Sequence, residues 1–146
     1  GQVGGGLGEE ELAFLDQSLK AAQTEELYTL VCLHHQPVKI GSEWLDEQMV
    51  ADAGAFFDVL DRYEGVKGVL WGHVHQEIDC LRNGVRLLAS PSTCVQFAAG
   101  CENFEADKQP PGYRWLQLRS DGQIETGVSR VWDTEFVVEL GSGGYL

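Results

Sequence analysis

The chain has 146 residues, of which 43% are hydrophobic and 23% charged, the composition of one ordinary globular domain. Its formal net charge of −13 at pH 7 argues against binding to nucleic acid or an anionic membrane, because both attract a surplus of Lys and Arg. No apolar run approaches the ~20 residues of a membrane-spanning helix. The four cysteines show no C-x-x-C spacing, so we expect a reducing, cytoplasmic setting.

The first half of the sequence predicts a strand–helix–strand unit. After a flexible glycine-rich stretch over residues 1–8, leucines at helical spacing predict a helix over Glu9–Ala22. The apolar run Tyr28–Leu33 predicts a strand that is covered on both faces. A second helix over Asp46–Tyr63 leads to another apolar strand, Val66–Trp71. This order is typical of two parallel neighbouring strands joined by a right-handed crossover.

The second half predicts two β-hairpins. The dipeptides Asn83-Gly84 and Asp121-Gly122 are strong turn signals. Each lies between two runs with strand character: Glu77–Leu81 with Val85–Ala89, and Tyr113–Leu118 with Ile124–Val131. A long irregular stretch over residues 98–112 separates the hairpins, and residues 132–146 form a tail. We therefore expect one α/β domain over residues 1–146, with a βαβ unit followed by two hairpins.

All four histidines stand directly after the two predicted parallel strands. His34 and His35 follow the first strand, and His73 and His75 follow the second. Parallel strands end at the same edge of a sheet, where α/β proteins bind ligands, and a neutral imidazole offers one lone pair to a metal ion. A single histidine here would be explained by hydrogen bonds to backbone or water, but two clusters favour a metal site. We expect Gly72 to provide the sharp turn that points His73 and His75 inward.

Five segments of the chain resemble one protein family in their order and spacing. They are His34-His35-Gln36-Pro37, Gly41-Ser42-x-Trp44-Leu45-Asp46, Gly72-His73-Val74-His75-Gln76-Glu77, Pro91-Ser92-Thr93-Cys94-Val95-Gln96-Phe97 and Pro111-Gly112-Tyr113-Arg114. Together they resemble the C-terminal half of the bacterial 3′,5′-cyclic AMP phosphodiesterases, in the calcineurin-like metallophosphoesterase superfamily. The segment from Pro91 to Phe97 is the most specific, and it favours the cyclic-nucleotide branch of the superfamily.

The resemblance implies a four-layer αββα metallophosphoesterase sandwich with two divalent metal ions at the strand ends, of which this chain is the C-terminal half. It implies that His34 and His73 bind the second metal ion, that His75 binds the first, and that His35 faces the substrate phosphate as a catalytic group. Manganese, iron and zinc all suit mixed nitrogen and oxygen ligation. The implied reaction is in-line attack on phosphorus by a metal-bridging hydroxide, which opens the 3′ ester of cyclic AMP and releases 5′-AMP.

Three motifs of that family, D-x-H, G-D-x-x-x-D and G-N-H-[DE], occur nowhere in this sequence. They supply the bridging aspartate and the remaining aspartate, histidine and asparagine groups. Two close cations repel each other strongly unless a bridging anion compensates. We therefore expect a truncated polypeptide or proteolytic fragment that is catalytically inactive and binds at most one metal ion weakly. Parts of Tyr28–Leu33 would then be uncovered, which predicts a homodimer through the sheet edges.

Two other functions stay open. The first is hydrolysis of another phosphodiester, such as a 2′,3′-cyclic nucleotide or a glycerophosphodiester, which the segment from Pro91 to Phe97 disfavours. The second is a non-catalytic module in which three histidines bind one zinc ion, or bind nothing.

Several further side chains have expected roles. Trp71 and Trp115 are expected in the core, whereas Trp44 is a candidate for contact with a nucleobase. Arg114 is expected in a surface ion pair rather than on the phosphate. Cys94 and Gln96 either line the site or belong to a packed strand. One of three carboxylates near the histidines is expected to support an imidazole: Asp46, Glu77 or Asp79.

Overall fold

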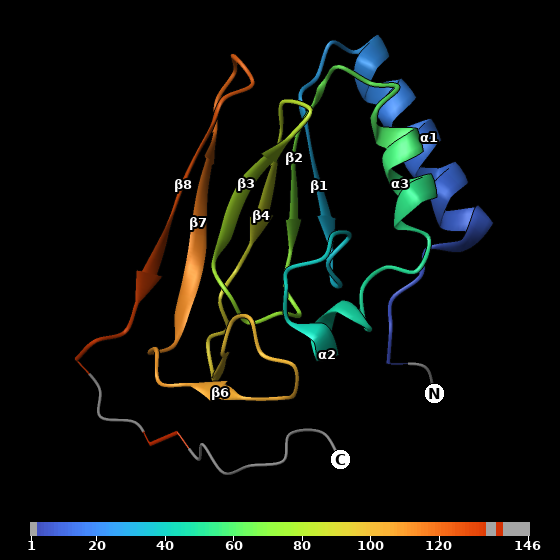
Figure 1. The fold of residues 1–146 in the computed structure, drawn as a ribbon. Coiled ribbons are helices and arrows are strands. Elements are labelled where there is room, and N and C mark those ends of the chain that lie inside the picture. Colours follow the sequence, from blue (N-terminus) through green and yellow to red (C-terminus); the bar gives the residue numbers. More distant parts are fainter. Residues whose placement is uncertain (1–2, 134–136, 139–146) are drawn as a thin grey trace.

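The computed structural model describes residues 3–133 and 137–138 as a layered α/β domain (Figure 1). Most of the predicted tail over residues 132–146 lies outside the described residues. The elements, in chain order, are α1 (Gly8–Thr24), β1 (Thr29–Leu33), α2 (Glu43–Asp46), α3 (Ala53–Leu60), β2 (Val66–Trp71), β3 (Ile78–Arg82), β4 (Val85–Ala89), β5 (Gln96–Phe97), β6 (Ala106–Asp107), β7 (Gly112–Leu118) and β8 (Ile124–Arg130).

A four-stranded sheet with the order β1-β2-β4-β3 forms the centre of the domain. Strands β1, β2 and β4 are parallel, and β3 runs antiparallel to β4. Leu33 pairs with Trp71, and Trp71 pairs with Ala89, so the three parallel strands end level with one another. The predicted parallel pair and the first predicted hairpin are thus confirmed, and three strands reach the edge at which the histidines lie.

The sheet has helices on one face and a second β layer on the other (Figure 1). Helices α1 and α3 cover the first face, and the β7–β8 hairpin covers the opposite face. The core between helices and sheet is apolar and includes Leu19, Phe56, Leu60, Val69 and Trp71, all at most 2% exposed. This arrangement confirms the expected fold class, because it supplies one helical layer and both β layers of an αββα sandwich.

The single helix predicted over Asp46–Tyr63 is wrong. Helices α2 and α3 are separated by residues 47–52, and two backbone amides of this connector bind carbonyls elsewhere in the chain. The amide of Val50 donates to the carbonyl of Gln36 (3.0 Å), and the amide of Ala51 donates to the carbonyl of Gly5 (2.9 Å). These tertiary hydrogen bonds replace the helical ones, so the connector leaves the helical path although its apolar spacing suits a helix.

Strand β1 is less covered than predicted. It is an edge strand of the sheet, Cys32 is exposed, and its other residues are half-buried. The prediction that β1 is covered on both faces is therefore wrong. Its uncovered edge agrees with the other prediction, that parts of Tyr28–Leu33 are exposed. Trp115 is also not a core residue, since it is 44% exposed and its ring lies over Gly127 on the paired strand.

The glycine-rich start of the chain lies against the α2–α3 connector. Residues 3–7 form neither helix nor strand, and the amide of Gly5 donates to the carbonyl of Gln48 (3.2 Å). The carboxylate of Asp52 accepts hydrogen bonds from the amides of Leu7 and Gly8 at 2.7–3.2 Å. The expected flexibility of residues 1–8 stays a prediction, although these hydrogen bonds hold part of the stretch in place.

Gly68 in β2 allows the two β layers to approach closely. A Cβ atom at this position would lie 2.8 Å from Cδ1 of Ile124 on β8 and 3.0 Å from Cδ1 of Leu30 on β1. Real Cβ atoms essentially never come within 3.0 Å of another heavy atom. The absence of a side chain therefore sets the spacing between the sheet and the β7–β8 hairpin.

We expect Gly68→Ala to lower the free energy of unfolding by about 1–3 kcal/mol, because the added methyl group overpacks the space between the layers. Urea denaturation measures this change. In an Ile124→Val background, which lacks Cδ1, the same substitution should cost less, since the two side chains are directly coupled. An equal cost in both backgrounds would contradict the close approach.

Candidate metal centre

The candidate site is built from three loops that leave the parallel strands at one edge of the sheet. His34 and His35 follow β1, the segment from Gly72 to Gln76 follows β2, and Ser90 begins the loop after β4. Hydrogen bonds continue the alignment beyond the strands. The amide of Gly72 donates a hydrogen bond to the carbonyl of His34 (3.2 Å), and the amide of Ser90 donates one to the carbonyl of Trp71 (3.0 Å). The predicted meeting of the two histidine clusters at this edge is therefore confirmed.

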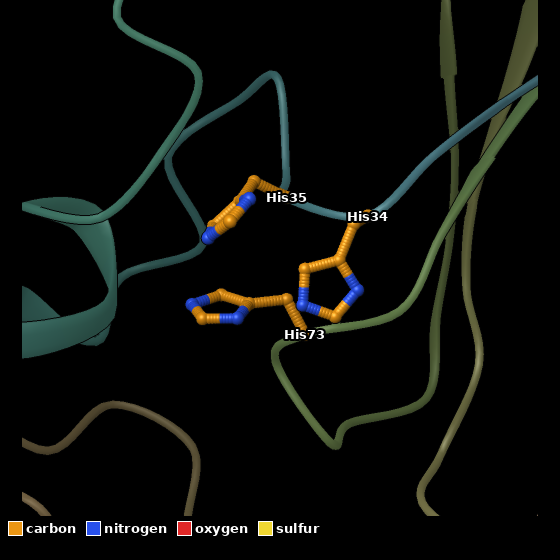
Figure 2. Close-up of side chains that lie close together, drawn as sticks. All are labelled: His34, His35 and His73. Atoms are coloured by element: carbon orange, nitrogen blue, oxygen red, sulfur yellow. The ribbon is translucent and has the colours of Figure 1, made fainter. Parts of the chain in front are cut away.

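His34, His35 and His73 gather into one cluster, and Figure 2 shows their rings side by side. One nitrogen from each ring lies within 4.8 Å of the others. In the tetrahedral geometry of zinc, two nitrogen ligands stand about 3.3–3.4 Å apart, since each bond is about 2.0–2.1 Å long. The three rings could therefore hold a single cation only after their nitrogens move closer together, by up to about 1.5 Å.

The sharp turn that exposes the imidazoles of the second loop lies at the histidines themselves. His73 and His75 have φ angles of 51° and 49°, whereas Gly72 is not in the left-handed region. The amide of Val74 donates to the carbonyl of Gly72 (2.5 Å) across His73. The role predicted for Gly72 is thus wrong. Non-glycine residues in this conformation carry backbone strain, which is concentrated at functional sites in proteins.

His75 takes a different place from the other three histidines. Its ring stacks on Phe97, with centroids 4.1 Å apart and planes at 14°. Its Nδ1 lies 2.9 Å from the carbonyl oxygen of Val95, which can only accept, so Nδ1 carries the proton and Nε2 the lone pair. The structure does not bring His75 into the cluster of three, and the ligand and catalytic roles implied for the four histidines stay predictions.

The partners of the imidazoles are not the carboxylates considered from the sequence. Gln48 Oε1 lies 3.0 Å from Nε2 of His73, and the carbonyl oxygen of Val3 lies 3.1 Å from Nε2 of His35. The three candidate carboxylates bind other groups: Asp46 the amides of Ile40 and Gly41, Glu77 the Arg130 guanidinium, and Asp79 the Arg86 guanidinium. No pattern in the sequence marks Gln48, because its reach depends on the break between α2 and α3.

Arg114 connects the two β layers. Its guanidinium donates to the carbonyls of Ala89 (2.9 Å) and Ile78 (3.0 Å) and to Oγ1 of Thr126 (3.2 Å). The surface ion pair expected for Arg114 is therefore wrong. The residue instead ties the β7–β8 hairpin to the sheet below the site.

Trp44 and Gln96 hold the loops around the site by packing and hydrogen bonding. Trp44 is half-buried and packs edge-on against Phe97 and Phe104, with centroids 5.1 and 5.3 Å apart. Gln96 is buried in β5, where its side-chain amide donates to the carbonyls of Ser92 (2.7 Å) and Cys94 (3.2 Å). Gln96 thus belongs to a packed strand and also lines the cavity beside His75, whereas Cys94 is exposed.

Burial favours the neutral form of three imidazoles, those of His35, His73 and His75. Burial, with a smaller contribution from charge repulsion by the nearby His35, His34 and His75, lowers the pKa of His73 to about 4. Burial is also the main cause that lowers the pKa of His35 and of His75, in both cases with repulsion from His34. A neutral imidazole keeps a lone pair for a metal ion. The rings of His35, His73 and His75 therefore need not lose a proton to bind a metal ion at neutral pH.

We expect the pKa of His73 to make the chain less stable in mild acid. The pKa is about 4 in the folded chain and about 6.5 in the unfolded one, so the unfolded state binds more protons between these values. The free energy of unfolding should therefore fall as the pH falls from about 6.5 to about 4. Urea denaturation at several pH values in the presence of a chelator measures this slope.

The control for this pH dependence is His73→Asn, since asparagine tolerates the left-handed backbone at this position. The variant should show a smaller loss of stability over the same pH range than the original chain. Equal slopes would contradict a depressed pKa of His73.

No family model matches the chain, but sequence relatives cover almost all of it. It is 48% identical over 145 residues to a 3′,5′-cyclic adenosine monophosphate phosphodiesterase CpdA from Pseudomonas aeruginosa, covering 99% of this chain and 53% of the relative. It is 45% identical over 141 residues to the CpdA of Escherichia coli K12, covering 97% and 50%. The chain thus spans about half the length of these relatives.

A solved structure shows a similar fold. A dimetal phosphatase from Danio rerio matches with a TM-score of 0.51 and 18% sequence identity, over 84% of this chain and 36% of that one. This likeness shows that the chain has the fold of the metallophosphoesterase class. Within this class the chain belongs with the bacterial 3′,5′-cyclic AMP phosphodiesterases and corresponds to their C-terminal half.

Proposed function

We propose that this chain is part of a metal-dependent phosphodiesterase that hydrolyses 3′,5′-cyclic AMP to 5′-AMP. The observation that carries the proposal is the cluster of His34, His35 and His73, in a chain 48% identical over 145 residues to a relative named as a cyclic AMP phosphodiesterase. Hydrolysis of another phosphodiester, such as a 2′,3′-cyclic nucleotide, is the alternative that a substrate panel tests.

The roles proposed for the histidines follow the chemistry of their rings. His34 and His73 would hold one cation, and His75 would hold a second one through Nε2. His35 would face the substrate phosphate from beside them. Two bound divalent ions, manganese, iron or zinc, would supply Lewis acidity and lower the pKa of a water molecule. The chain's own contribution is a set of neutral nitrogen donors held at one edge of the sheet.

We further propose that the printed sequence alone is inactive. It contains neither the bridging aspartate motif nor the other carboxylate motifs of the family. Without a bridging anion, two cations at the usual separation of ~3.5–4 Å repel each other strongly. The histidine cluster would then hold at most one cation, and weakly.

Metal analysis and a cyclic AMP assay test this proposal together. We expect at most one Mn²⁺ or Zn²⁺ per chain by calorimetric titration, and no conversion of cyclic AMP to 5′-AMP by chromatography. His73→Asn should abolish the binding, whereas His75→Asn should leave it unchanged, because His75 lies outside the cluster of three. Two ions per chain, or turnover of cyclic AMP, would contradict the proposed inactivity.

A polypeptide extended to the length of the relatives, so that it carries the carboxylate motifs, should bind two ions and hydrolyse cyclic AMP. Comparing its rates on 3′,5′-cyclic AMP, 2′,3′-cyclic AMP and a glycerophosphodiester decides between the proposed substrate and the alternative. Metal binding by the extended polypeptide without hydrolysis of any of them would favour a non-catalytic zinc module.

The uncovered edge of the sheet supports a proposed homodimer. Cys32 on the edge strand β1 is exposed, and Leu27 and Tyr28 beside it are 52% and 51% exposed. Exposed strand edges pair with other chains, and a charged side chain on the edge prevents such pairing.

Light scattering should therefore give twice the 16.1 kDa of one chain. Cys32→Lys should give a monomer, because it places a charge on the edge strand β1. Cys80→Lys, in the opposite edge strand β3, is the matched control and should keep the dimer. A monomer in the original chain would remove this proposal.

We also propose a cytoplasmic location. The four cysteines are free, and three of them, Cys32, Cys80 and Cys94, are exposed, which suits a reducing compartment. Among the described residues, no helix is both long enough and apolar enough to cross a membrane.

A further inference from the structure

The side chain of Gln48 has its orientation fixed by the backbone around it. Its Nε2 donates a hydrogen bond to the carbonyl of Trp44 (3.1 Å), so its Oε1 must be the atom that faces His73. Its own amide donates to the carbonyl of Leu45 (2.9 Å), and its carbonyl accepts from the amide of Gly5 (3.2 Å). Gln48 is thus held from both sides before it meets the imidazole.

This orientation determines the tautomer of His73. An amide oxygen can only accept a hydrogen bond, so Nε2 of His73, 3.0 Å away, must carry the proton. The lone pair of the neutral ring is then on Nδ1. If the other tautomer formed, two acceptor atoms would face each other across this contact, which would cost a hydrogen bond at a half-buried site.

The same part of the chain holds His35. Its Nε2 donates to the carbonyl of Val3 (3.1 Å), which leaves its lone pair on Nδ1 as well. Gly5 lies directly against this ring, since a Cβ atom there would be 2.8 Å from Cβ and Cγ of His35. Residues 3–7 and the connector over residues 47–52 therefore act as one support behind two imidazoles of the cluster.

We infer that Gln48 is a positioning residue that fixes the Nδ1 lone-pair tautomer and the orientation of His73 for a divalent cation. The metal part of this inference rests on the proposed function, whereas the tautomer part does not. Loss of such a partner behind a ligating histidine typically lowers metal affinity about 10–100-fold.

Nitrogen-15 NMR of the imidazoles in the metal-free chain at neutral pH tests the tautomer directly. The original chain should show His73 protonated at Nε2. Gln48→Leu should give a mixture of both tautomers, and Gln48→Glu, which keeps an acceptor, should restore the original one. Gln17→Leu, at an exposed position of α1, is the matched control and should change nothing.

Calorimetric titration with Zn²⁺ alone tests the consequence for binding. Gln48→Leu should weaken the affinity about 10–100-fold, and Gln48→Glu should bind at least as tightly as the original chain. A His73 tautomer or a zinc affinity that is the same in Gln48→Leu as in the original chain would overturn the inference. If the original chain binds no zinc while the tautomer shifts, the positioning of the ring stands and the metal part of the inference fails for the chain alone.

Discussion

Parallel pairing of β1, β2 and β4 is the constraint on which the candidate site depends. His34 and His73 are far apart in the sequence, and they meet because Leu33 and Trp71 are in register at the ends of neighbouring strands. The third strand brings the loop after Ala89 to the same edge. A shift of this register would separate the histidines, so the apolar residues that fix the sheet also fix the distances between the imidazoles.

The electrostatics of this edge contrast with those of the whole chain. The chain carries a formal charge of −13, yet the described partners of the imidazoles are an amide oxygen and backbone carbonyls rather than carboxylates. Burial lowers the pKa of His35, His73 and His75 and keeps these three imidazoles uncharged at neutral pH, although the carbonyls of Val3 and Val95 act in the opposite direction on His35 and His75. Such an edge offers lone pairs without the negative charge that two close cations require. The presence of nitrogen donors without carboxylates at this edge agrees with the proposal that the carboxylate ligands belong to another part of the parent protein.

Local signals predicted the strands and turns well, because these depend on neighbouring residues. Asn83 and Gly84 have φ angles of 51° and 81°, the left-handed pair that the Asn-Gly turn predicts. The break between α2 and α3 was not predictable in this way, because it depends on carbonyls of Gly5 and Gln36 that are distant in the sequence. The contact of Gln48 with His73 follows from that break, so this part of the site was missed for the same reason.

The left-handed backbone at His73 and His75 gives one short loop two different imidazole environments. His73 turns toward His34 and His35, with its lone pair on Nδ1, whereas His75 stacks on Phe97, with its lone pair on Nε2. Each tautomer is fixed by a separate acceptor, Gln48 for one ring and Val95 for the other. Two ligands separated by a single residue would otherwise compete for one cation. Opposite tautomers and different ring partners separate their lone pairs, as the proposed two neighbouring cations require.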